Sequence, residues 1–262
     1  MSGPATPNPW HALRALTPAR IALGRAGVSV PTSVQLDFQL AHARARDAVH
    51  TPLDCPALAT QLAQASHVPI QVHSACPDRA TYLQRPDLGR RLDEPSRAAL
   101  GAAAAPTCEL ALVVADGLSA LAVAQNAAPF IEALLARLCA DGWVRPPIVI
   151  VQQGRVAIGD EIGALLGARC VVVLIGERPG LSSPDSMGLY MTWQPRPGLS
   201  DAQRNCISNV RPAGMGYEEA AHKLHYLLEQ ARTRRLSGVT LKDETNAPEI
   251  ALDGGVSNFL LK

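Results

Sequence analysis

The sequence of 262 residues has little net charge and few aromatic side chains. Lysine and arginine together number 24 and aspartate and glutamate 23, so the formal net charge is +1. A near-neutral chain has no global field to attract nucleic acid or an anionic membrane. Aromatic residues, at 4%, leave few platforms on which bases could stack. Binding to nucleic acid or to a membrane surface is therefore not expected.

The sequence also lacks the patterns of export, of membrane insertion and of a cysteine metal site. Its start has no basic segment followed by an apolar one, and no apolar run approaches the roughly 18 residues of a membrane span. No two cysteines form a C-x-x-C pair; they are Cys55, Cys76, Cys108, Cys139, Cys170 and Cys206. Disulfides and a zinc site are not expected, and we predict a reduced, soluble, cytoplasmic protein.

Apolar runs that alternate with helical patterns predict an α/β fold with a parallel sheet covered on both faces. The expected strands are 109–115, 147–151, 169–175 and 188–193. The expected helices begin near Ser33, where Val34, Phe38, Ala41, Ala45 and Ala48 form a buried stripe, and continue with 118–140, 159–166 and 217–236.

These elements predict a Rossmann-like parallel sheet domain over residues 106–242. It is preceded by a mainly helical N-terminal region, residues 17–105. Residues 1–16, rich in proline, are expected to be disordered, and the tail 243–262, which has no clear periodicity, to be flexible.

Three loops are expected at the carboxyl ends of the strands, where open parallel sheets bind their ligands. They are 116–119, 152–156 and 176–180. The first contains one glycine, so the G-x-G-x-x-G fingerprint of dinucleotide enzymes is missing, and no P-loop is present. The same turn lacks the second glycine of a nucleophile elbow. Ser119 is therefore interpreted as a helix N-cap or a ligand contact rather than a nucleophile.

Several other side chains allow a functional and a purely structural interpretation. His222 and His225 are three residues apart, but they have no carboxylate or cysteine partner at matching spacing, so a metal site is not expected. Arg90 and Arg91 could bind phosphate, although salt bridges or subunit contacts are favoured. The surrounding segment 82–91 contains Pro, Gly and several arginines, and this predicts a structured turn rather than core.

Glu177 and Cys206 follow the predicted strands. Glu177 could pair with the adjacent Arg178 or meet the amides of a ligand, and the spacing alone favours neither. Cys206 is expected in a loop after the sheet, as a small buried residue, because nothing nearby in the sequence would activate its thiol.

Six segments in a fixed order resemble one family, the light (small) subunits of ethanolamine ammonia-lyase. They are 17–27, 85–92, 116–119, 154–156, 176–181 and 206–209. No single segment is diagnostic, but the order is specific, and the resemblance runs from about Pro18 to Thr240.

The resemblance implies an adenosylcobalamin-dependent lyase that converts ethanolamine to acetaldehyde and ammonia. In that family a TIM-barrel large subunit holds the substrate and carries out the radical rearrangement, and the corrinoid lies between it and the Rossmann-like small subunit. A hetero-oligomer is therefore expected, with no catalytic residue and no metal ligand in this chain. The cofactor contacts of the family match Val156, Glu177 and Cys206.

The chemistry of these three side chains suits a corrin. A valine can pack on the apolar corrin face, a carboxylate can accept hydrogen bonds from the rim amides, and a small cysteine lets the backbone approach. The turn 116–119 lacks the histidine of the D-x-H-x-x-G motif, so we expect the cofactor to be base-on.

Two other functions remain as alternatives: a nucleotide-binding oxidoreductase, and a non-catalytic Rossmann-like binding or scaffold subunit. Location in a bacterial microcompartment is a second option beside the cytoplasm. Some members of the family carry a long N-terminal extension linked with packaging, whereas the region before Pro18 is short in this sequence.

Overall fold

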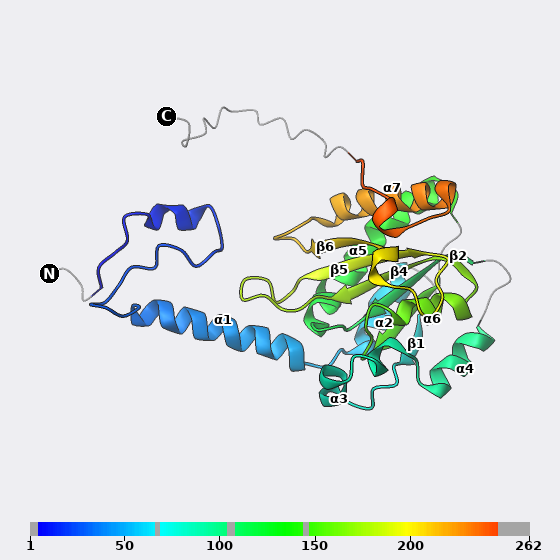
Figure 1. Ribbon diagram of the computed structural model, residues 1–262, viewed down its shortest axis with the longest axis horizontal. Helices are drawn as coiled ribbons and strands as arrows, with labels where there is room; N and C mark the ends of the chain where they lie inside the picture. Colours follow the sequence, from blue (N-terminus) through cyan, green and yellow to red (C-terminus); the bar gives the residue numbers. More distant parts are fainter. Residues whose placement is uncertain (1–4, 66–68, 104–107, 144–146, 246–262) are drawn as a thin grey trace.

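The computed structural model describes residues 5–65, 69–103, 108–143 and 147–245. An α/β domain is built on one six-stranded sheet, and an arm projects from one side of it (Figure 1). We define the arm as residues 5–44, the N-terminal segment and most of the first helix. The helices are α1 (Thr32–His50), α2 (Cys55–Ala65), α3 (Arg79–Gln84), α4 (Glu94–Ala102), α5 (Ala120–Ala140), α6 (Ile158–Leu165) and α7 (Tyr217–Arg234), with short 3-10 turns η1 (His11–Ala15), η2 (Leu88–Arg90), η3 (Asp201–Gln203) and η4 (Gly238–Thr240).

The sheet has the order β1-β3-β2-β4-β5-β6, and its first four strands are parallel. The strands are β1 (Ile70–His73), β2 (Cys108–Ala115), β3 (Ile148–Gln152), β4 (Ala168–Gly176), β5 (Met187–Trp193) and β6 (Arg204–Val210). The predicted strand 188–193 corresponds to β5. It runs antiparallel to β4, and β6 runs antiparallel to β5. The link between Gly176 and Met187 is too short for the crossover helix that a parallel neighbour of β4 would need.

Strand β1 lies in the segment for which mainly helices were expected, and it pairs in parallel with β3. Its four residues, IQVH, are too few to show a period-2 pattern. Near the N-terminus, η1 and a bridge between Thr6 and Arg25 are formed. Residues 1–4 and 246–262 of the two expected terminal segments lie outside the described residues.

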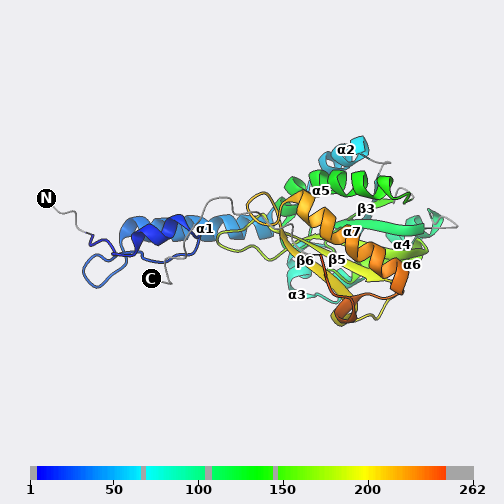
Figure 2. The ribbon, with the colours of Figure 1, turned by 90° about the horizontal axis from the view of Figure 1, so that it is seen from above.

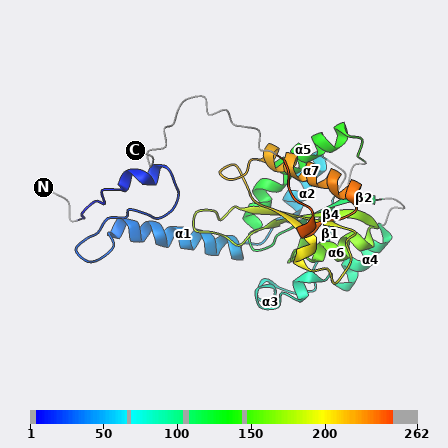
Figure 3. The same cartoon turned by 45° about the horizontal axis from the view of Figure 1, so that its top comes forward.

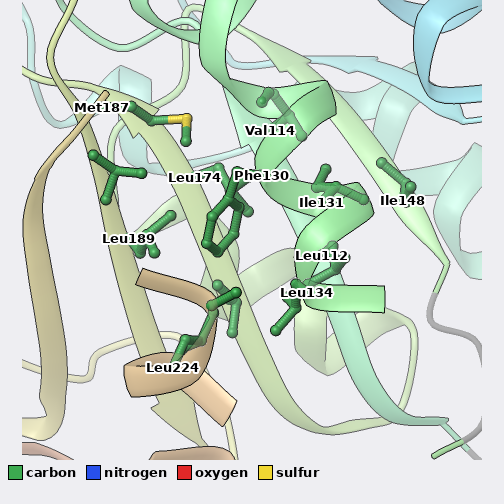
Figure 4. Packing of buried hydrophobic residues seen from close by; sticks show 14 of the residues in the cluster. Leu112, Val114, Phe130, Ile131, Leu134, Ile148, Leu174, Met187, Leu189 and Leu224 are labelled. Carbon is green, nitrogen blue, oxygen red and sulfur yellow. The ribbon is translucent and has the colours of Figure 1, made fainter. Parts of the chain in front are cut away.

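One face of the sheet is covered by α2, α5 and α7 (Figure 2). Phe130, Ile131 and Leu134 of α5 are fully buried. Phe130 lies beside Leu174 of β4 and Leu189 of β5, and Ile131 and Leu134 lie near Leu112 of β2 (Figure 4). Burying a side chain of this size contributes about 1.5–3 kcal/mol, so this layer is a main source of stability.

The opposite face is covered by α4 and α6 (Figure 3). Ile158 and Ile162 of α6 pack against Val171 and Val173 of β4, which confirms that the apolar strand runs are buried on both faces. Helix α6 starts directly after the predicted loop 152–156, so it fixes where that loop leaves the sheet. Among the described residues, none of the helices combines the length and apolarity of a membrane span.

Candidate functional site

The three predicted loops meet at the carboxyl edge of the parallel strands. The amide of Leu118 donates to the carbonyl of Gly176 at 2.9 Å, and the amide of Gly154 donates to Asp116 Oδ1 at 3.2 Å. A side chain at Gly176 would collide with the carbonyl oxygen of Ser119 and lie 2.7 Å from that of Asp116. The predicted convergence of the loops is therefore confirmed, and it depends on a close backbone approach at Gly176.

Ser119 is the N-cap of α5, as one of the two interpretations predicted. Its hydroxyl oxygen accepts a hydrogen bond from the amide of Ala122 at 3.2 Å. The same hydroxyl donates to the carbonyl of Pro184 at 2.7 Å, in the β4–β5 loop. Both bonding capacities of the hydroxyl are used within the chain, so Ser119 orders two loops.

Asp116 is buried beneath the loops, and desolvation raises the pKa of its carboxyl while Arg79 and nearby backbone amides oppose that shift. Arg79 Nη1 lies 3.6 Å from Asp116 Oδ2 and also donates to Gln153 Oε1 at 3.3 Å. Its Nε donates to the carbonyl of Val49 at 2.7 Å, near the end of α1. Arg79 therefore joins the helix that carries the arm to the edge of the sheet.

Tyr82 corrects the expectation that segment 82–91 contributes no core. Its side chain is fully buried, with the guanidinium groups of Arg79 and Arg155 at 4.6 and 4.1 Å from the ring centroid. Its hydroxyl donates to the carbonyl of Gly154 at 3.1 Å. Cation–π stacking with these two arginines, which lie outside the segment 82–91, lets Tyr82 of α3 bury its ring and support the Gly154 loop.

The three predicted cofactor contacts lie on the α6 side of the sheet. Val173, Tyr190 and Cys206 are in register across β4, β5 and β6, and Val173 and Tyr190 pack in the core layer of that side. Glu177 follows four residues beyond Val173, so it has the same side-chain direction. Val156, just before α6, packs half-buried against the same layer. The structure thus places all three residues around one open face.

The carboxylate of Glu177 forms no ion pair with the adjacent Arg178 in the described part of the chain. Its Oε2 accepts hydrogen bonds from the hydroxyl of Ser186 and from the amide of Asn209 at 3.2 Å. Within the described part of the chain, Oε1 has no hydrogen-bond donor. It occupies space left by the missing side chain of Gly188, where a Cβ would lie 2.9 Å from it. One oxygen is therefore anchored, and the other is available to a ligand amide.

Cys206 corrects two expectations, because it lies within strand β6 and its side chain is exposed. The sequence of β6, RNCISNV, is polar because β6 is an edge strand whose α6-side face no helix covers, and this composition resembles a loop. Cys206 Sγ lies 3.4 Å from Ser208 Oγ. Burial, together with the nearby Cys206, raises the pKa of Tyr190.

A buried ion pair, which the sequence did not indicate, joins the elements that carry Val156 and Cys206. Arg204, the first residue of β6, binds both carboxylate oxygens of Asp160 in α6 at 2.6 and 2.7 Å. The exposed fractions of the two side chains are 3% and 2%. Arg204 also donates to Thr192 Oγ1 at 3.1 Å. Charged residues in a strand and a helix suggest surface positions, so no sequence signal could have shown this pair.

The described residues contain no group of three histidine, cysteine or acidic side chains that could hold a metal ion. His225 Nε2 lies 2.8 Å from Asp141 Oδ2, a local pairing within the α5–α7 layer. Arg90 and Arg91 line a cavity of about 660 Å³ whose remaining charged residues are all acidic. They are Asp87, Asp160, Glu161 and Asp201. This balance of charge does not favour a phosphate.

The fold and this face define an α/β protein with an open, broad, mixed apolar and polar surface on the α6 side of a mostly parallel sheet, reaching its carboxyl edge at Glu177. A sequence model of the ethanolamine ammonia-lyase light chain matches residues 7–242. The ethanolamine ammonia-lyase small subunit of Ralstonia nicotianae is 62% identical over 259 residues, covering 98% of this chain and 95% of that protein. The small subunit of Azotobacter vinelandii is 60% identical over 264 residues, covering 98% and 97%. The chain belongs to the family of ethanolamine ammonia-lyase small subunits, and so to a lyase.

Proposed function

We propose that this chain holds adenosylcobalamin against the large subunit of an ethanolamine ammonia-lyase, which converts ethanolamine to acetaldehyde and ammonia. The observation that carries the proposal is the open face on which Val156, Glu177 and Cys206 gather, with Glu177 Oε1 left without a donor in the described residues. In this proposal the chain contributes no catalytic residue.

The side chains on this face fit a corrin in kind and in spread. Cys206 pairs through Tyr190 with Val173, two strands away and four residues before Glu177. The face therefore extends about 13 Å along the strands, the rise of four residues, and roughly 10 Å across them, the width of two strand spacings. A broad ring needs contacts spread this widely, whereas a metal ion would need them to converge. Val156 offers an apolar contact to the ring, and Glu177 Oε1 offers an acceptor to a rim amide. Cys206, which is small and exposed, allows close approach.

When bound, adenosylcobalamin supplies the radical chemistry, and the work of this chain is to bind and orient it. The buried pair of Arg204 and Asp160 keeps the elements of Cys206 and Val156 together, and Ser186 holds the carboxylate of Glu177. The turn after β2 carries no histidine to replace the lower base, which supports base-on binding. The proposed location is the cytoplasm, with a microcompartment as the alternative.

The two other candidate functions have weaker support. An oxidoreductase would need a phosphate cradle after β2, but that turn has one glycine and its loop is filled by Asp116 and Ser119. A scaffold subunit that binds no cofactor would not need a carboxylate such as that of Glu177, in which one oxygen is held by hydrogen bonds and the other has no donor among the described residues.

The test replaces Glu177 by alanine in the complex co-expressed with the large subunit. A charge-assisted hydrogen bond contributes about 1.5–3 kcal/mol, so Glu177→Ala is expected to weaken cobalamin binding about ten- to hundredfold without preventing assembly. Cobalamin affinity is measured by titration of its visible spectrum, and ammonia release from ethanolamine is followed in parallel. The control is Glu132→Ala, an exposed carboxylate on α5, on the opposite side of the sheet.

Glu177→Gln separates the charge from the shape of the side chain. It should bind cobalamin more tightly than the alanine variant and less tightly than the natural chain. Unchanged affinity in Glu177→Ala would refute the assigned role of this carboxylate. A wild-type complex that shows no cobalamin spectrum and no ammonia release would refute the proposed function as a whole.

A further inference from the structure

The large apolar side chains that the described residues leave exposed are concentrated in the arm. Eight of them lie between residues 10 and 40, and one, Val239, lies elsewhere. The eight are Trp10, Leu16, Ile21, Val28, Val30, Leu36, Phe38 and Leu40. Scattered apolar residues are normal on a protein surface, but a cluster confined to one projecting element marks an interaction surface.

The predicted buried stripe of α1 is fully buried only at its C-terminal end, at Ala45 and Ala48, while Val34 and Ala41 are half-buried. Phe38, in the projecting part, is 40% exposed, although the guanidinium of Arg20 lies 5.9 Å from its ring and His42 stacks beside it. The N-terminal segment therefore gives this side of the helix part of its cover.

Leu36 and Leu40 lie on the other side of α1. They are four residues apart, so they share one face of the helix, while Phe38 is rotated by about 200° from Leu36. Their exposed fractions are 58% and 50%. An isolated helix of this length, open to water over most of its surface, gains little from its own packing, so a surface that covers Leu36 and Leu40 would stabilise it.

The arm is continuous with the face proposed to meet the cofactor. Arg20 Nη2 donates to the carbonyl of Leu181 at 3.4 Å, and Ser182 Oγ donates to the carbonyl of Pro18 at 3.5 Å. Leu181 and Ser182 belong to the same β4–β5 loop as Glu177. A partner that covers the cofactor face is therefore placed to reach the arm as well.

The charge of the arm distinguishes between possible occupants. Residues 5–44 contain four arginines and one aspartate, a formal charge of +3, whereas the whole chain carries +1. Two copies of the arm would repel each other, while an apolar groove with an acidic rim would attract it. This argues for a different chain rather than a second copy.

We propose that the arm is a docking element for the large subunit, and that the Leu36–Leu40 face inserts into an apolar groove with an acidic rim on that subunit. The proposal rests on the proposed function in one respect: the large subunit is the chain that covers the cofactor face.

The experiment uses the double variant Leu36→Ser/Leu40→Ser, co-expressed with a tagged large subunit in the absence of cobalamin. Truncating two apolar anchors of an interface should weaken association at least tenfold. The amount of small subunit that co-purifies and the sedimentation of the complex both measure this loss. Val239→Ser is the matched control, because Val239 is 63% exposed and lies outside the arm. Circular dichroism of the free double variant should match that of the natural chain, since both leucines are exposed.

Assembly of the double variant at wild-type strength would overturn the proposal. A second set of results would also overturn it: the free natural chain forms a dimer, the double variant is a monomer, and both associate equally with the large subunit. The Leu36–Leu40 face would then bind a second copy of this chain. Since assembly is scored without cofactor, the result is separate from the proposed function: a complex that depends on the arm but binds no cobalamin would refute only the latter.

Discussion

Removal of Arg204 should destabilise the domain more than removal of any exposed arginine. Arg204→Met keeps much of the aliphatic length and deletes the guanidinium. Burial disfavours the charge of Arg204, but the hydrogen bonds and charge of Asp160 outweigh that cost, and the pKa of Arg204 is raised. The variant therefore leaves the carboxylate of Asp160 buried at 2% exposure without this partner.

The expected loss in the free energy of unfolding is about 3–5 kcal/mol, the cost of breaking a buried pair by removing one member. The upper part of this range is favoured because Arg204 also donates to Thr192 and to the carbonyl of Leu199 at 3.1 Å each. Arg204→Met/Asp160→Leu removes both charges and should recover most of the loss. Arg137→Met is the control: its pair with Glu218 is exposed by 36% and 76%, so a change below about 1 kcal/mol is expected.

Urea unfolding of the full chain at neutral pH, followed by circular dichroism, measures all four proteins. A loss below 1 kcal/mol for Arg204→Met would refute the reasoning, because the pair would then behave as an exposed one. A double variant no more stable than Arg204→Met would show that the loss comes from packing around the methionine rather than from the unpaired carboxylate.

Two further predictions concern close packing and thiol access. Gly176→Ala should lower the free energy of unfolding by about 1–3 kcal/mol, because its Cβ would meet backbone oxygens on the neighbouring loop. Gly101→Ala, with open space around it, should raise the free energy of unfolding by about 0.5–1 kcal/mol. Equal urea midpoints for the two variants would contradict this prediction. An alkylating reagent at neutral pH should modify the exposed Cys139 and Cys206 quickly and the four buried cysteines only after unfolding. Burial raises the pKa of Cys55 to about 11, which leaves it almost wholly in the unreactive thiol form; mass spectrometry showing early labelling of Cys55 would refute this order.

The central strands could be predicted from the sequence because burial on both faces leaves a continuous apolar run. The strand expected at 109–115 corresponds to β2, Cys108–Ala115, within one residue, and the helix expected at 118–140 begins two residues later at Ala120. Strand β1 could not be predicted because its identity comes from pairing with β3, not from its four residues. The antiparallel direction of β5 could have been predicted, because the link between β4 and β5 is too short for a crossover helix.

The candidate site was predictable only where local sequence determines position. The placement of Glu177 at the end of β4 follows from an apolar strand that ends in a glycine. The exposure of Cys206 depends on β6 being an edge strand, and the buried pair of Arg204 and Asp160 joins residues that are 44 positions apart. Long-range pairings of this kind leave no periodic signal.

The place of β1 in the sheet also sets an order on folding. Strands β2, β3 and β4, which form the middle of the sheet, all lie between Cys108 and Gly176. Strand β1 contacts the sheet through β3 alone, and Ile70 pairs with Val149. As the chain leaves the ribosome, β1 is therefore synthesised long before its partner, and it remains an unpaired segment until β3 has been made. The strand that is made first can therefore join the sheet no earlier than β3, the third strand in the sequence.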